Sequence, residues 1–241
     1  MDFKNVYEDD LRAESYARLE FPGTYYLAYR DLPEIIGKYA EGNNALDFGC
    51  GTGRSARFLK KLGFNVTGID ISRSMISIAE NLNPGGKYYC MNLSDFAVKI
   101  PGKFDLVTAI FTFDNIPEHE KRIELLTKLN DMLNDSGKII LVDSTPLIYL
   151  NEWLSFSTID FPENRSAKSG EKVKIIMKDV EDKRPVEDII WFAGDYSELF
   201  NRSGLKLLEQ YEPLGRPDEQ IEWASEKEIA PWIIYVLGKQ N

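Results

Sequence analysis

A glycine-rich turn is the part of this sequence whose residue types and spacing point most directly to chemistry. Residues 47–53 read DFGCGTG and separate a short apolar run, 45–48, from an amphipathic segment, 52–62. Glycine adopts positive φ at little steric cost and lets the backbone approach a ligand closely. The helix that follows offers unpaired N–H groups, which can donate to a carboxylate. The segment therefore predicts a turn that holds a carboxylate-bearing ligand through its backbone.

An acidic residue follows the second predicted strand. Asp70 stands about twenty residues beyond the glycine turn, where a carboxylate can accept hydrogen bonds from both hydroxyls of a ribose. Taken alone, Asp70 is an ordinary loop carboxylate. In an open α/β sheet, however, ligands bind outside the carboxyl ends of the strands, and the glycine turn and Asp70 both fall at that edge. Their combination predicts a nucleoside site.

Residues 47–53 together with Asp70 resemble the signature of class I S-adenosylmethionine-dependent methyltransferases of the small-molecule type, and the resemblance spans roughly residues 24–145. A dinucleotide-binding turn would have a glycine where this chain has Arg54, which argues against a nicotinamide oxidoreductase. The resemblance implies a Rossmann-like fold, S-adenosyl-L-methionine as cofactor and methyl transfer as the activity.

The resemblance also implies roles for individual residues. Asp47 and the glycines would hold the methionine portion of the cofactor, Asp70 its ribose and Ile71 its adenine ring, while Asn92 would contact the adenine amino group from a position where the family often has Asp. The segment Phe21–Tyr26 resembles the N-terminal region in which a tyrosine closes over the cofactor carboxylate, so either Tyr25 or Tyr26 is a candidate. The predicted cofactor site comprises Tyr25, Asp47, Gly49, Cys50, Gly51, Gly53, Asp70, Ile71, Asn92, Leu93 and Phe111.

The residues after the fourth predicted strand, 111–114, would lie beside the methyl donor. Many family members have a His there, whereas this chain has Asp114 and Asn115. Asp114 is the candidate catalytic carboxylate, and it is equally consistent with a cap for the helix expected near Pro117. His119 lies among charged residues, which favours a solvated helix face. An amine acceptor needs no strong base, and the sequence has no metal-ligand cluster, so we expect a metal-independent reaction.

The elements that position these residues follow from hydrophobic patterning. From Asn44 onward, short apolar segments alternate with amphipathic ones, which is typical of a doubly wound, mostly parallel sheet, here with seven strands. The predicted strands are 45–48, 65–69, 87–91, 104–111, 138–142, 205–211 and 232–237. The predicted helices are 8–19, 24–39, 52–62, 72–82 and 117–133, with a further helix capped by Asp195 in a capping box with Glu198 and ended by Gly204.

The chain reads as one methyltransferase domain in four parts. Residues 1–43 form a helical cap, 44–146 the cofactor-binding core, 147–194 an inserted lid with antiparallel strands at 172–180 and 186–192, and 195–241 the segment that completes the sheet. The inserted segment and its surroundings hold an aromatic cluster that is consistent with core packing, a dimer contact or a substrate lid. Its members are Trp153, Phe156, Phe161, Trp191 and Phe192.

Composition narrows the partners. The 241 residues have a formal net charge of −10, which disfavours nucleic acid as a partner. Two cysteines make no disulfide framework, and we find neither a signal peptide nor a membrane-spanning run, so we expect a soluble, cytoplasmic protein and a possible homodimer. The expected function is methyl transfer to a nitrogen or oxygen of a small-molecule acceptor. The alternatives are a methyltransferase acting on protein or RNA, and a catalytically silent cofactor-binding protein of the same fold.

Overall fold

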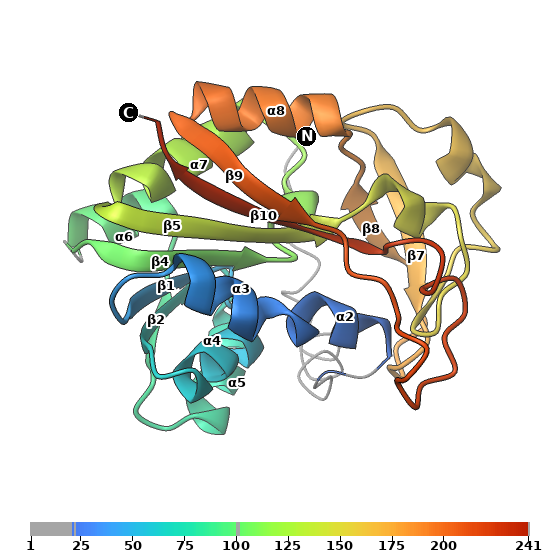
Figure 1. Ribbon diagram of the computed structural model, residues 1–241, viewed down its shortest axis with the longest axis horizontal. Helices are drawn as coiled ribbons and strands as arrows, with labels where there is room; N and C mark the ends of the chain where they lie inside the picture. Colours follow the sequence, from blue (N-terminus) through green and yellow to red (C-terminus); the bar gives the residue numbers. More distant parts are fainter. Residues whose placement is uncertain (1–20, 22, 100–101, 241) are drawn as a thin grey trace.

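A seven-stranded sheet forms the centre of the molecule. The computed structural model describes residues 21, 23–99 and 102–240, so the predicted helix 8–19 lies outside the described residues. The strand order is β3-β2-β1-β4-β5-β10-β9, and β10 runs antiparallel to both of its neighbours (Figure 1). The strands are β1 (Asn44–Phe48), β2 (Asn65–Asp70), β3 (Lys87–Cys90), β4 (Phe104–Ile110), β5 (Leu133–Ser144), β9 (Leu205–Tyr211) and β10 (Trp232–Lys239). The predicted Rossmann-like, mostly parallel sheet is confirmed.

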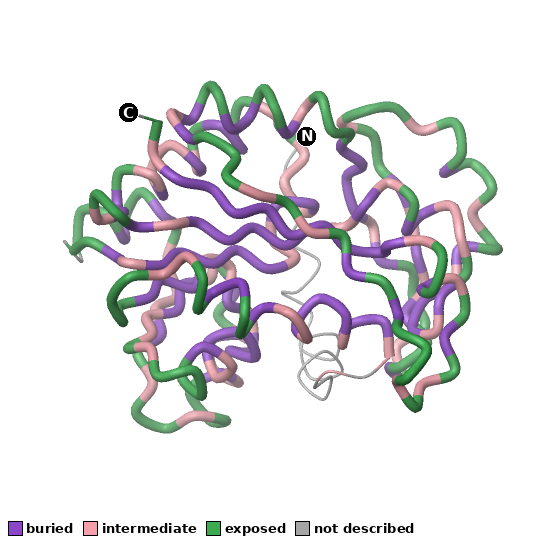
Figure 2. Tube along the Cα trace, in the orientation of Figure 1, coloured by how far each residue is buried: buried purple, intermediate pink, exposed green. Residues whose placement is uncertain are grey.

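Helices cover the two faces of this sheet. They are α2 (Thr24–Arg30), α3 (Leu32–Tyr39), α4 (Arg54–Lys61), α5 (Arg73–Leu82), α6 (Leu93–Lys99), α7 (His119–Asp131) and α8 (Ala193–Arg202). Along β10, Trp232, Ile234 and Val236 enter the core shared with α2 and α3. The alternate residues Ile233 and Tyr235 enter the core shared with α7 and α8, as the two-residue period of a strand requires. Figure 2 shows that burial is concentrated along the central strands.

Several predicted boundaries were wrong for local reasons. The predicted helix 24–39 is two helices, because Asp31 ends the first and Pro33, which lacks an N–H, lies at the start of the second. The helix that follows the glycine turn begins at Arg54 because Gly53 has a left-handed φ of 77°. Helix α7 ends at Asp131, and the strand predicted at 138–142 already begins at Leu133.

Two helix starts also differ from the sequence-based assignment. Asp195 is not the N-cap of α8. Phe192 is the N-cap, and Asp195 is the third helical residue, whose Oδ2 accepts a hydrogen bond from the N–H of Phe192 at 2.8 Å. Helix α6 was not predicted at all. It follows Asn92, whose Oδ1 accepts a hydrogen bond from the N–H of Asp95 at 2.9 Å and so supplies the cap for this short helix.

A small antiparallel sheet lies beside the carboxyl ends of β1, β4 and β5. It contains β6 (Phe156–Ser157), β7 (Lys172–Met177) and β8 (Val186–Ile189), in the order β6-β7-β8, and we call it the lid sheet (Figure 1). Three short 3₁₀ turns complete this region: η2 (Phe113–Asn115), η3 (Pro146–Tyr149) and η4 (Pro162–Ser166). In the part of the chain that the structure describes, no helix is long and apolar enough to cross a bilayer.

The buried carboxylate of Glu226 joins the N-terminal helices, the lid region and the C-terminal loop. It accepts hydrogen bonds from the Thr24 hydroxyl at 2.6 Å, the Leu154 N–H at 2.8 Å and the Ala224 N–H at 2.8 Å. The same Thr24 oxygen accepts from the N–H of Ser155 at 3.0 Å. One side chain with no solvent exposure therefore holds three distant segments in place.

Replacement of this carboxylate tests how much it contributes to the stability of the fold. Glu226→Ala leaves the buried Thr24 hydroxyl and two partly buried backbone N–H groups without their acceptor, so we expect a loss of about 3 kcal/mol in the free energy of unfolding, measured by urea denaturation. The exposed neighbour Glu228 provides the control, and Glu228→Ala is expected to change stability by less than about 0.5 kcal/mol. Equal stability of the two variants would contradict this role.

Candidate active site

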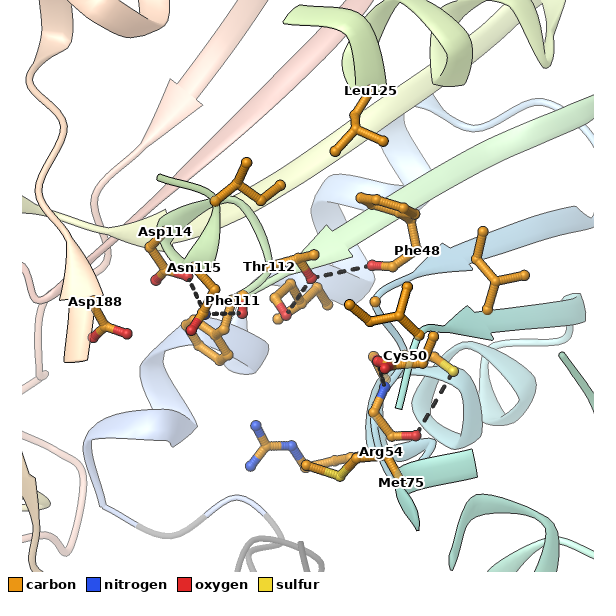
Figure 3. A pocket seen from close by; sticks show the side chains of 18 of the residues that line it. Phe48, Cys50, Arg54, Met75, Phe111, Thr112, Asp114, Asn115, Leu125 and Asp188 are labelled. Carbon is orange, nitrogen blue, oxygen red and sulfur yellow. Dashed lines mark hydrogen bonds between the residues drawn. The ribbon is translucent and has the colours of Figure 1, made fainter. Parts of the chain in front are cut away.

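A cavity of about 720 Å³ opens where the turns after β1, β2 and β4 meet α2 and the lid sheet. Its size falls within the range typical of small-ligand sites. One end is formed by the glycine turn, the end of β2 and the start of α6, and the other by aromatic and aliphatic side chains of α2, β7, β8 and β10. Figure 3 shows Cys50, Arg54 and Met75 at one end and Phe111, Asp114 and Asp188 at the other.

Most of the predicted cofactor residues lie at this cavity. Asp47 and Gly53 do not line it. Those that do are Tyr25, Gly49, Cys50, Gly51, Asp70, Ile71, Asn92, Leu93 and Phe111. Tyr26, the alternative to Tyr25, is not part of the lining and stacks on Trp223, with 6.4 Å between ring centroids.

The glycines of the turn serve different physical needs. Gly49, Gly51 and Gly53 have φ values of 70°, 52° and 77°, a region that only glycine adopts readily. A methyl group on Gly49 would lie 2.5 Å from the Thr112 side chain, and one on Gly53 would lie 2.8 Å from the Tyr88 hydroxyl. A methyl group on Gly51 would meet no atom of the described residues within 4 Å, and Gly51 lines the cavity. Gly51 therefore leaves space for a ligand, whereas the other two leave space for the protein.

Asp47 lies beneath the turn and does not face the cavity. Its carboxylate accepts hydrogen bonds from the Ser55 hydroxyl at 2.5 Å and the Thr108 hydroxyl at 2.8 Å, which joins β1 to α4 and β4. Burial raises the pKa of Asp47 to about 6, although the two hydroxyl donors oppose that shift. The local role of this residue is to fix the path of the turn.

Asp70 joins the ends of β1 and β2. Its Oδ2 accepts the N–H of Gly51 at 2.9 Å, and its Oδ1 accepts the N–H of Ser72 at 2.8 Å. Burial raises the pKa of this carboxyl group, against the lowering effect of the backbone donors. Each carboxylate oxygen has a second lone pair, so Asp70 can also accept hydrogen bonds from a ligand.

Apolar side chains flank Asp70 in the cavity. Ile71 is 54% exposed, and Met75, Met91 and Leu93 line the cavity near it. The exposed Asn92 also lies at the cavity, but its side chain is bonded to Asp95 as described above. The surface is suited to the flat face of a base, with Ile71 and Asn92 at its rim.

Arg54 is a cavity residue that sequence reasoning used only as evidence against a dinucleotide turn. It is the first residue of α4 and is 6% exposed, and its guanidinium lies over the rings of Tyr25 at 4.9 Å and Tyr29 at 5.5 Å. It projects from the glycine turn into the cavity (Figure 3). A buried cation at a helix start is well placed to receive a carboxylate. Its position directly after the glycine turn, in the run GTGR, is the sequence signal that could have identified it as a cavity residue.

Four aromatic rings form one wall of the cavity. Tyr25 stacks on Trp232 with centroids 5.6 Å apart, and Phe111 and Phe156 lie 4.6 Å and 5.7 Å from Trp232. Phe111 has a φ of 56°, the only positive φ among the described residues other than glycine. Such strain persists only where surrounding contacts enforce it and is frequent at functional sites. Here it directs the chain from β4 into the cavity wall.

Three carboxylates lie buried at the lid end. Asp114 in η2 accepts hydrogen bonds from the Ser144 hydroxyl and from the Asn115 amide, each at 3.0 Å, and Tyr149 donates to Asp188 at 3.1 Å. Asp143 accepts from the Tyr196 hydroxyl at 2.8 Å. Burial raises the pKa of all three acids, and mutual repulsion raises those of Asp143 and Asp188 further. The alternative role for Asp114, a helix cap, is wrong because α7 begins at His119 with Glu118 as its N-cap.

Arg122 provides a positive charge to this cluster. Its guanidinium has no solvent exposure, lies 4.4 Å from the Trp191 ring and 4.7 Å from the Tyr196 ring, and lacks a hydrogen-bond partner among the described residues. The predicted solvated face for His119 is only partly present. The ring of His119 packs against Trp191, with 5.4 Å between centroids, and both of its nitrogens are buried.

The aromatic cluster predicted in the inserted segment is mainly core. Trp153, Phe156 and Trp191 are buried, and Phe156 alone among the five lines the cavity. Phe192 is 40% exposed. Within residues 21, 23–99 and 102–240, no group of three His, Cys, Asp or Glu side chains is arranged to hold a metal ion.

Comparison with known proteins agrees with this geometry. A family model described as a methyltransferase domain matches residues 22–210. An uncharacterized methyltransferase of Bacillus mycoides is 32% identical over 117 residues, which cover 48% of this chain and 53% of that protein, so the chain spans about half the length of the curated relatives it matches.

Solved structures share the fold over nearly the whole chain. The CcbJ methyltransferase from Streptomyces caelestis matches with a TM-score of 0.69 at 16% identity, covering 97% of this chain and 98% of that one. An S-adenosylmethionine-dependent methyltransferase from Clostridium acetobutylicum matches with a TM-score of 0.62 at 16% identity, covering 98% and 97%. The glycopeptide N-methyltransferase MtfA, complexed with S-adenosylmethionine, matches with a TM-score of 0.61 at 14% identity, covering 88% and 93%.

The raised pKa of Asp143 gives a pH-dependent prediction. Its folded-state pKa lies above the unfolded value of about 3.9, so its ionisation lowers stability as the pH rises through the range between the two values. Asp143→Asn removes that cost. We therefore expect the substitution to raise the melting temperature, and to raise it more at pH 8 than at pH 5. Asp131→Asn, at an exposed position, is the control. A shift that is the same at both pH values would disprove the electrostatic cause.

Proposed function

Because the chain belongs to the methyltransferase-domain family, we propose that it transfers a methyl group from S-adenosyl-L-methionine to a nitrogen or oxygen atom of a small-molecule acceptor. The observation that carries this proposal is a continuous cavity. It joins the glycine turn and Asp70 to an aromatic, carboxylate-bearing end.

The residues at the glycine turn fit the cofactor. Gly51 leaves an open position at the cavity wall, Asp70 offers carboxylate lone pairs to ribose hydroxyls, and Arg54 offers a cation to the methionine carboxylate. Ile71, Met75 and Leu93 offer apolar surface to the adenine. Asn92 at the rim is proposed to contact the adenine amino group. Asp47 supports the turn from below, and Tyr25 closes the cavity from α2.

The chain chiefly aligns the reactants and excludes water. S-adenosyl-L-methionine supplies a methyl carbon already activated by a positive sulfur, so a positioned acceptor with a free lone pair suffices. Phe111, Phe156 and Trp232 hold the acceptor end of the cavity in an apolar environment. Asp114, at the cavity wall, is proposed to accept the proton when the acceptor is a hydroxyl group.

The enclosure of the acceptor end favours a small acceptor over a macromolecule. The lid sheet and α2 both contribute to its lining, and we assign acceptor enclosure to the inserted segment 147–194 of a single methyltransferase domain. Among the structural neighbours, MtfA is named an N-methyltransferase of glycopeptides, which supports nitrogen as an acceptor atom for this fold. Methyl incorporation from radiolabelled cofactor into small-molecule extracts, compared with protein and RNA fractions, tests the acceptor class.

Removal of the Asp70 carboxylate tests the ribose assignment. Asp70→Ala is expected to weaken binding of S-adenosylhomocysteine by about 1–3 kcal/mol, because hydrogen bonds to a charged acceptor are lost. Isothermal titration calorimetry measures this change. Asp135→Ala, which removes an exposed carboxylate near the start of β5, is the control. If Asp70→Ala binds the ligand as tightly as the parent, the ribose lies elsewhere.

A pair of glycine substitutions distinguishes the effect of backbone strain from that of a side chain that blocks the cofactor site. Gly51 and Gly63 have positive φ values of 52° and 94°, and a methyl group on either would meet no atom of a non-adjacent residue within 4 Å in the part of the chain that the structure describes. Both alanine variants bear the cost of a left-handed residue, but only Gly51 lines the cavity. We expect Gly51→Ala to bind S-adenosylhomocysteine at least about tenfold more weakly, or about 1.4 kcal/mol, and Gly63→Ala to bind it normally. Equal affinities would refute contact between the turn and the cofactor.

A further inference from the structure

The inner face of the lid sheet is apolar except at one position. Residues of β7 and β8 alternate between the two faces of the sheet, and those that line the cavity are Ile175, Met177, Val186 and Asp188. Asp188 lies opposite Val173 in the strand pairing, and Val186 lies opposite Ile175. A carboxylate at a core-facing strand position costs stability unless it is paired or bound to a ligand.

The charges around Asp188 do not balance. Asp114 and Asp143 both act on it by repulsion, and burial is the larger cause of its raised pKa. The positive charge of Arg122 lowers the pKa of Asp114 and of Asp143 but does not lower that of Asp188. Among the described residues, the Tyr149 hydroxyl is the one hydrogen-bond donor found on this carboxylate. Within residues 21, 23–99 and 102–240, therefore, no cation is paired with this carboxylate at the cavity wall.

The position of Asp188 relative to Asp114 distinguishes their roles. Both residues line the cavity, and Asp188 extends from β8 toward the turn that carries Asp114 and Asn115 (Figure 3). Both oxygens of Asp114 already accept hydrogen bonds, from Ser144 and Asn115. Asp188 uses one oxygen for Tyr149, which leaves more of its acceptor capacity for a ligand.

We propose that the acceptor of the proposed methyl transfer is a primary or secondary amine on an apolar body, and that Asp188 binds it as an ammonium ion. This inference rests on the proposed function. The four aromatic rings of the wall and the side chains of Ile175 and Val186 enclose the apolar body. An ammonium ion supplies the missing charge, whereas a neutral alcohol does not and a carboxylate is repelled.

The reaction balances with the groups at the site. The ammonium group gives one proton to the Asp188 carboxylate, which frees the nitrogen lone pair. That nitrogen then forms a bond to the methyl carbon as the carbon–sulfur bond breaks, and the bonding electron pair stays on sulfur. The product is a methylated ammonium ion, and the spent cofactor is a neutral thioether. No oxidant, metal or further reactant is required.

The test begins with the protein saturated with S-adenosylhomocysteine. Binding of matched probes is measured by calorimetry, using a series of primary amines from butylamine through 2-phenylethylamine to tryptamine and the alcohol and carboxylate analogues of each. We expect at least one amine to bind tenfold or more tightly than its alcohol analogue, and the carboxylates not to bind. No amine preference anywhere in the series overturns the proposal.

Two neighbouring residues of one strand give a matched pair of variants. Asp188→Asn and Glu187→Gln each remove one carboxylate with little change in shape, but Glu187 faces away from the cavity and is bonded to Lys172 at 2.8 Å. We expect Asp188→Asn to lose the amine preference by tenfold or more while its affinity for alcohols is unchanged. Glu187→Gln is expected to keep the preference. Retention of the preference in Asp188→Asn overturns the proposal.

The melting temperature of Asp188→Asn distinguishes a ligand-binding role from a purely structural one, because the two roles predict changes of opposite sign. Ionisation of Asp188 lowers folded-state stability because its pKa is raised, so Asp188→Asn is expected to melt at a higher temperature than the parent at pH 8. A structural residue would show a lower melting temperature instead. The binding of S-adenosylhomocysteine, measured first, separates the failures: its absence refutes the proposed function, whereas intact cofactor binding without amine preference refutes only this inference.

Discussion

The site depends on carboxylates held away from water at the carboxyl edge of the sheet. Asp47 is buried and Asp70 is partly buried, and each is stabilised by donors from a different element than its own: Ser55 and Thr108 for Asp47, and Gly51 for Asp70. Because an ionised carboxylate without such donors is costly to bury, these bonds fix the relative positions of the turns after β1 and β2. The same bonds position Gly51 at the cavity wall. The binding surface is thus defined by the backbone geometry that Asp47 and Asp70 hold in place.

Local features of the fold could be predicted from the sequence, whereas features set by packing could not. The glycine turn was predictable because φ values such as the 52° of Gly51 require glycine, a property of the residue itself. Strands β1 and β4 were predictable because their apolar runs match strands buried on both faces of a parallel sheet. Helix α6 was missed because it spans only Leu93–Lys99, although Asn92, followed three residues later by Asp95, is a cap signal.

The cavity-lining role of Asp188 could not be read from the sequence for a different reason. The segment Val186–Ile189 contains two adjacent acids, and a strand turns one of them inward and the other outward. Which acid faces the cavity depends on the pairing of β8 with β7 and on the position of the lid sheet over the central sheet. Both are long-range facts. Arg54 was missed similarly, because its place among Tyr25 and Tyr29 depends on how α2 packs on α4.

The two ends of the cavity therefore follow different physical rules. At the glycine turn, the carboxylates of Asp47 and Asp70 are satisfied by hydroxyl and backbone donors of the protein itself. At the lid end, Asp114, Asp143 and Asp188 repel one another, and Arg122 relieves only the first two. Under our proposal, a cation bound beside Asp188 offsets this repulsion. A neutral ligand of the same shape gains the apolar contacts but not this electrostatic contribution. The proposed selectivity at the lid end therefore arises from the charge of Asp188 as well as from apolar contacts.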